Sequence, residues 1–121
     1  MEYVHQINFG GFKLDERSEQ LLHGREIGGQ GCNIRCIQVP PGGGSPAGRH
    51  VHTFEQIYYI ISGVMDLEVD GKEFKVGPGS LVYLPLGVPH RNWNGSNEPV
   101  VHLALMVPEP APGEPISRTV A

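Results

Sequence analysis

The chain has 121 residues with 17 glycines and 11 prolines, and its net charge is −4. This length fits one domain with its own core, and the lack of a basic cluster excludes a nucleic-acid footprint or an anionic membrane patch. No apolar run reaches transmembrane length and no secretory pattern opens the sequence, so we expect a cytoplasmic protein. Glycines and prolines scattered through an apolar chain favour short strands joined by tight turns.

The first half of the chain carries weak signals. We expect a short strand over residues 3–9, a polar stretch with turn or weak helical character over 13–20, and a strand over 33–39. A loop rich in glycine and proline follows over 40–49, without the Gly-Lys-Ser/Thr signature of a phosphate loop. Cys32 and Cys36 lie four residues apart, about 13 Å along a strand, beyond the roughly 7 Å that a disulfide spans, so both are expected to be reduced.

The second half predicts a series of strands, over residues 56–61, 65–69, 74–76, 80–84, 90–93 and 100–107. Alternating apolar and polar residues from Met65 to Asp70 indicate a half-buried strand, and Asp70-Gly71 is a strong hairpin signal. Regular turns between short strands indicate an all-β barrel or sandwich. The tail from Pro108 is rich in proline, and we expect it to be extended and loosely held, or draped over a partner subunit.

Three histidines form the main functional signal. His50 and His52 are two residues apart, so on a strand both point to one face and can bind one ion together. His90 follows a turn and can supply a third nitrogen from a neighbouring strand. Each could also be an ordinary strand or turn residue, but the joint spacing of all three favours a metal site.

These histidines stand in two patterns of fixed spacing, G-x5-H-x-H-x3-Q-x6-G and G-x5-P-x-G-x2-H-x3-N. The matching residues are Gly44, His50, His52 and Gly63 in the first, and Gly79, Pro85, Gly87, His90 and Asn94 in the second. In both patterns the chain resembles the cupin superfamily, in particular its small single-domain type-2, RmlC-like members. The resemblance implies an all-β double-stranded β-helix, the jelly-roll cupin barrel, and commonly a homodimer. We expect one domain over 1–121, with the motif core at 44–94, an N-terminal flank at 1–32 and a tail at 108–121.

The resemblance also suggests the fourth metal ligand, because cupins usually have a glutamate where this chain has Gln56. Some members with a Glu-Gln pair in this position use the glutamine oxygen. Glu55 could serve instead, but strand alternation places Gln56 on the face of Tyr58 and Ile60, with Glu55 pointing away. We therefore expect His50, His52, Gln56 and His90 to bind one divalent transition metal, either Fe, Mn, Ni, Co, Cu or Zn.

Two further residues are candidates for catalysis. Tyr58 has inward parity and can act as an acid, a base or a hydrogen-bond donor, while His102 lies in an apolar strand and can move a proton. Both could instead be ordinary core residues. In similar cupins that linearise unsaturated uronates, an aspartate assists the reaction at the position where this chain has Ala104. The resemblance therefore gives less support for that particular activity here. Arg35, Arg49 and Arg91 are possible anchors for a substrate carboxylate; the latter two neighbour inward histidines and should face outward, which leaves Arg35.

The sequence leaves three functions open. The favoured one is a metal-dependent enzyme that acts on a small oxygenated substrate by Lewis-acid chemistry, as an isomerase, lyase or cyclase. The alternatives are an Fe(II)-dependent dioxygenase and a non-catalytic, metal-supported protein that binds a small molecule. Open metal positions distinguish a catalytic site from a structural one.

Overall fold

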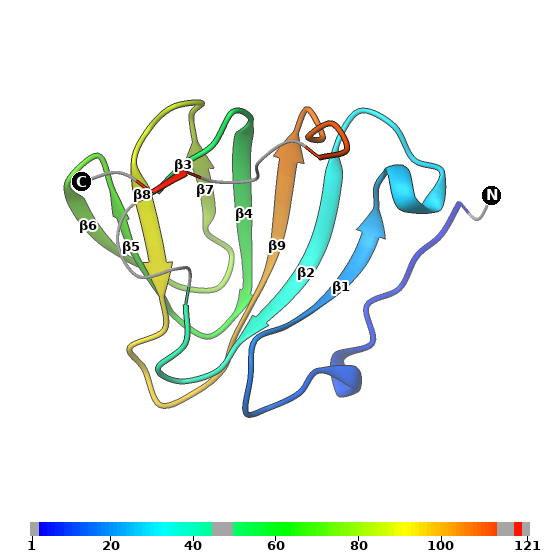
Figure 1. Ribbon diagram of the computed structural model, residues 1–121. Helices are drawn as coiled ribbons and strands as arrows, with labels where there is room; N and C mark the ends of the chain where they lie inside the picture. The colour runs from blue at the N-terminus through cyan, green and yellow to red at the C-terminus, as the bar shows by residue number, and fades with distance from the viewer. Residues whose placement is uncertain (1–2, 45–49, 114–117, 120–121) are drawn as a thin grey trace.

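The structure is a computed structural model that describes residues 3–44, 50–113 and 118–119, with side chains described over 3–44 and 52–113. Two five-stranded antiparallel sheets face each other (Figure 1). The first has the order β1 (Ser18–His23), β2 (Asn33–Val39), β9 (Val100–Val107), β4 (Glu55–Ser62) and β7 (Leu81–Leu84). The second has the order β10 (Arg118–Thr119), β3 (His50–Val51), β8 (His90–Trp93), β5 (Met65–Val69) and β6 (Lys72–Val76). The prediction of an all-β fold is confirmed.

The core lies between the two sheets and follows the alternation of the strands. Ile60 and Leu84 of the first sheet are almost fully buried, as are Met65 and Leu67 of the second. Tyr58 and Ala104 are Cα partners across β4 and β9, and both belong to this core. Because partners in an antiparallel pair share a face, the register places the inward residues of β2, β9 and β4 side by side.

The hairpin between β5 and β6 turns at Asp70-Gly71, as the sequence predicts. Both residues have positive φ angles, 51° and 79°, which is the conformation that a tight type I′ turn requires. The strands predicted over 33–39, 65–69, 90–93 and 100–107 coincide with β2, β5, β8 and β9. Cys32 and Cys36 are free, which confirms that they form no disulfide.

The N-terminal part differs from the prediction. Residues 3–9 form no strand; a short 3₁₀ turn, η1 (Phe9–Gly11), ends the stretch. Tyr3 and Val4 are 92% and 74% exposed, so the apolar residues here stay at the surface and gain nothing from the core. In Figure 1 this segment runs outside β1. The strand forms later, at β1, because the backbone from Ser18 onward pairs with β2 even though its side chains are largely polar.

A second 3₁₀ turn, η2 (Arg25–Ile27), connects β1 to the loop before β2. The proline-rich tail contains one element that the sequence does not predict, the short strand β10, which pairs with β3. Within the described residues, no helix has the length and apolar character that crossing a membrane requires.

Candidate metal centre

His52 and His90 meet between the two sheets. Both side chains are buried, and their Nε2 atoms lie 3.1 Å apart. The turn before β8 holds both residues: the Gly87 N–H donates to the His52 carbonyl oxygen, and Nδ1 of His90 lies 3.1 Å from the Val88 carbonyl oxygen. Since a carbonyl oxygen can only accept, this contact places a proton on Nδ1 of His90, and Nε2 is then the nitrogen that a neutral ring would offer to a metal.

The distance between the two nitrogens suits a shared cation. Two imidazole nitrogens that each bind one ion at about 2.0–2.1 Å lie roughly 2.8–3.4 Å apart for bond angles between octahedral and tetrahedral. Phe54, which is buried, stacks on the His52 ring with 4.7 Å between centroids and an interplanar angle of 30°. This contact fixes the plane of the His52 ring. Sequence reasoning missed Phe54, although an aromatic residue between candidate ligands is a visible signal.

Gln56 occupies the inward face of β4, as its alternation predicts. Its Cα partners are Met106 on one side and Leu84 on the other, and its Oε1 atom is buried without a hydrogen-bond partner among the described residues. Glu55 points away, and its carboxylate accepts a hydrogen bond of 2.8 Å from the Tyr83 hydroxyl at the exposed surface. An unpartnered buried acceptor costs about 1–3 kcal/mol unless a ligand completes it, and an amide oxygen is a suitable metal ligand.

The register brings the backbone of His50 beside the same pair, because His50 is the Cα partner of His90 across β3 and β8. The predicted role of the His50 side chain falls outside the described side chains. Among the described side chains, no three histidines, cysteines or carboxylates converge on one point. The donors that the structure does describe, two facing imidazoles and a buried amide oxygen, are of the types that a divalent transition metal accepts.

Tyr58 and His102 lie deeper in the core, on the inward faces of β4 and β9. Their rings make an edge-to-face contact with centroids 5.0 Å apart, and Nδ1 of His102 is buried with no hydrogen-bond partner in the part of the chain that the structure describes. Burial, and to a smaller extent the positive charge of Arg17, lower the pKa of His102 to about 4, so the ring is neutral at pH 7. Burial raises the pKa of Tyr58, against a smaller lowering by Arg17. Sequence reasoning missed Arg17, whose proximity only the fold reveals.

The three arginines that are candidate anchors for a substrate carboxylate differ in where their side chains lie. Arg91 faces outward as predicted, with Nε 3.2 Å from Glu68 and its guanidinium 4.7 Å above the Trp93 ring. Arg49 lies outside the described residues. Arg35 lies on β2 opposite Ala104, and therefore shares the inward face with Tyr58.

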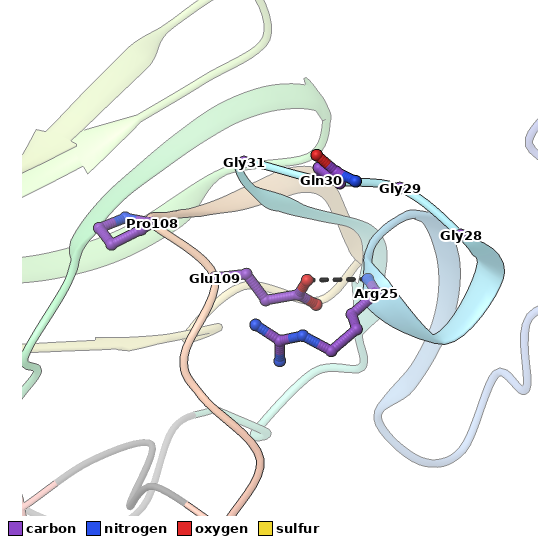
Figure 2. Close-up of a pocket in the computed structure, with 7 residues that line it drawn as sticks. All are labelled: Arg25, Gly28, Gly29, Gln30, Gly31, Pro108 and Glu109. Carbon is purple, nitrogen blue, oxygen red and sulfur yellow. Dashed lines mark hydrogen bonds between the residues drawn. The ribbon is translucent and has the colours of Figure 1, made fainter.

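Two hollows lie at the open edge of the first sheet, next to η2. The larger, about 470 Å³, is bordered by the glycine-rich loop before β2 and by Pro108 (Figure 2). In Figure 2 the Glu109 carboxylate points to the backbone of Arg25, and the bond is 2.8 Å long. The smaller, about 270 Å³, shares Arg25 and Glu109 with it but reaches inward to Arg35 and Met106.

Comparison with known proteins identifies the fold. Residues 36–107 match the family described as the cupin domain. The uncharacterized protein MJ1618 of Methanocaldococcus jannaschii is 32% identical over 89 residues, which cover 74% of this chain and 70% of that protein. The chain therefore belongs to the cupin family, and the predicted jelly-roll cupin barrel is confirmed.

Solved structures of enzymes share this barrel. The polyketide cyclase RemF from Streptomyces resistomycificus superposes with a TM-score of 0.77 at 23% identity, over 98% of this chain and 86% of that one. A putative sugar phosphate isomerase from Acidithiobacillus ferrooxidans superposes with a TM-score of 0.66 at 28% identity, over 75% of this chain. This chain spans 58% of the length of that isomerase.

Proposed function

We propose that this cupin is a metal-dependent enzyme that acts on a small oxygenated organic substrate by Lewis-acid chemistry, of the isomerase, lyase or cyclase type. One observation carries the proposal: the buried Oε1 of Gln56 and the facing nitrogens of His52 and His90 lie on the inward side of the barrel. The putative sugar phosphate isomerase that shares the barrel supports the choice of reaction type.

His50, His52, Gln56 and His90 would hold the metal. When bound, a divalent ion polarises a substrate carbonyl and stabilises an enolate or similar oxyanion. The four protein ligands would all be neutral, so the protein would leave the charge of the ion uncompensated. Such a donor set would favour substrates that bind the ion through an anionic oxygen.

His102 and Tyr58 provide the proton chemistry in this proposal. The His102 ring has a buried nitrogen with no partner among the described residues, and in this proposal that nitrogen accepts a proton from a carbon next to a carbonyl group and returns it at another position. The Tyr58 ring packs against His102 and its hydroxyl can donate a hydrogen bond to a substrate oxygen. Their Cα partners across β4 and β9, Ala104 for Tyr58 and Ile60 for His102, are buried as well.

Hydrogen exchange tests the proposal even while the substrate is unidentified. The metal-loaded protein is incubated in D₂O with a panel of small 2-oxo and 2-hydroxy acids and sugar phosphates, and NMR follows deuterium uptake beside the carbonyl group. We expect exchange that chelator abolishes, that one added metal restores, and that His102→Leu slows by about 100-fold or more. His5→Gln, a change at an exposed histidine, is the matched control and should exchange like the wild type.

Two results would count against the proposal. Tight binding of a panel member with no exchange and no product over hours would favour the non-catalytic binder. Oxygen consumption that depends on Fe(II) would favour the dioxygenase.

A further inference from the structure

The smaller hollow adjoins the candidate metal centre through one side chain. Met106 lines the hollow, and it is the Cα partner of Gln56 on β4 and of Asn33 on β2. Partners in an antiparallel pair share a face, so Gln56, Met106 and Asn33 form one inward row across three strands. The hollow therefore continues the inner surface of the barrel from the metal ligands towards the open edge at β1.

Arg35 is fixed at the wall of this hollow. Its Nε atom donates a 2.9 Å hydrogen bond to Oδ1 of Asn33, and its Nη1 atom pairs with Glu19. The Arg35 side chain is 26% exposed, so the guanidinium group is held in place yet still reachable. A guanidinium group held in this way loses little conformational entropy when it binds another oxygen.

The Nη2 group of Arg35 is less well satisfied. Its ion pair with Glu26 is 3.7 Å long, which is beyond hydrogen-bond distance. The Glu26 side chain is 72% exposed and therefore costs little to move. The other carboxylate of the hollow, Glu109, is already engaged by Asn33 and by the backbone of Arg25.

We infer that this hollow receives a carboxylate group of the substrate at Nη2 of Arg35, in the place where Glu26 now makes its loose ion pair. The inference rests on the proposed function, since the other end of the same substrate would reach the metal centre past Met106. Pro110 and Pro112 also line the hollow and can contact the carbon chain of the substrate. The substrate class is then a short acid with a second oxygenated group several bonds away from its carboxylate.

Two probes of equal chain length test the inference. Isothermal titration of the metal-loaded protein compares 2-oxoglutarate with 2-oxopentanoate, in which a methyl group replaces the distal carboxylate. We expect 2-oxoglutarate to bind about 10- to 100-fold more tightly. Arg35→Gln should remove this preference, because only 2-oxoglutarate brings the group that Arg35 binds.

A second variant tests the inference even if Arg35→Gln does not fold. Glu26→Gln removes the competing carboxylate at the surface and should tighten 2-oxoglutarate binding by about 3-fold, with no effect on 2-oxopentanoate. Glu73→Gln, at an exposed acidic residue on β6, is its matched control. Equal affinities for the two probes in the wild type would overturn the carboxylate subsite alone, whereas failure of both probes to bind the metal-loaded protein would contradict the proposed metal chemistry as well.

Discussion

Two groups of buried polar side chains, one on each sheet, differ in how completely they are paired. On the outer side of the second sheet, Asp66 accepts hydrogen bonds from Lys75 at 2.5 Å and from the Gly95 N–H at 2.9 Å. Glu68 beside it pairs with Arg91. On the inner side of the first sheet, Oε1 of Gln56 and Nδ1 of His102 have no partner within the described ranges.

The difference in pairing indicates that the two groups of buried polar side chains have different roles. Burial opposes the ionisation of Asp66, but its hydrogen bonds from Lys75 and Gly95 lower its pKa below the ordinary value. That group is complete within the protein and serves stability. The inner group carries an energetic cost that the described residues do not offset, which marks the place where a ligand can complete it.

The largest expected effect concerns the candidate metal ligands, which include Gln56 of the inner group and His90 of the second sheet. His90→Gln should weaken metal binding by roughly 100-fold or more, because a four-ligand zinc site is worth about 10–16 kcal/mol and one ligand about a quarter of that. Titration calorimetry with Zn²⁺ measures the change, and His5→Gln provides the matched control. Unchanged affinity in His90→Gln would show that His90 is not a metal ligand and would contradict the candidate metal centre.

The next effect is on the pH dependence of stability. The folded pKa of His102, about 4, lies below the ordinary value of 6.5, so the unfolded chain binds the extra proton first as the pH falls. Stability from this group is complete above about pH 6.5 and is lost towards pH 4, by on the order of 3 kcal/mol. Urea unfolding measures how much the free energy of unfolding falls between pH 7 and pH 4.5. This fall should be about 2 kcal/mol smaller in His102→Leu than in the wild type. An equal difference in both proteins would contradict the neutral, buried state of His102.

A substitution in the outer group should lower stability and leave metal binding unchanged. Asp66→Ala leaves the Gly95 N–H without its acceptor and removes the partner of Lys75, so we expect a loss of about 2 kcal/mol in the free energy of unfolding. Zinc affinity should stay within about 2-fold of the wild type. A large loss of metal binding in this variant would mean that the two groups are coupled through the barrel.

The smallest effect belongs to a polar contact at the surface. Tyr83→Phe removes the hydrogen bond to Glu55 at an exposed position, and stability should change by less than about 0.5 kcal/mol. Urea unfolding measures this change as well. A loss above about 1 kcal/mol would show that exposure alone does not separate dispensable contacts from structural ones.

The sequence predicted the strands whose alternation is clear, and it predicted the inward direction of Gln56, because both depend on local spacing. The predicted strand at residues 3–9 is wrong, since local apolarity does not reveal whether a neighbouring strand is available for pairing. The influence of Arg17 on His102 and the link from Gln56 through Met106 to Arg35 depend on pairing between distant strands. Spacing along the chain carries no information about such pairing.

The pairing of β10 with β3 has a practical consequence for work on this protein. Thr119 is the Cα partner of His50, which is itself the Cα partner of His90. A shortened chain that ends before Arg118 would leave β3 with an open backbone edge next to the histidine pair. Purification tags therefore belong on the amino-terminal side, where Tyr3 and Val4 are exposed, and ligation scars or protease trimming at the carboxyl end should be avoided.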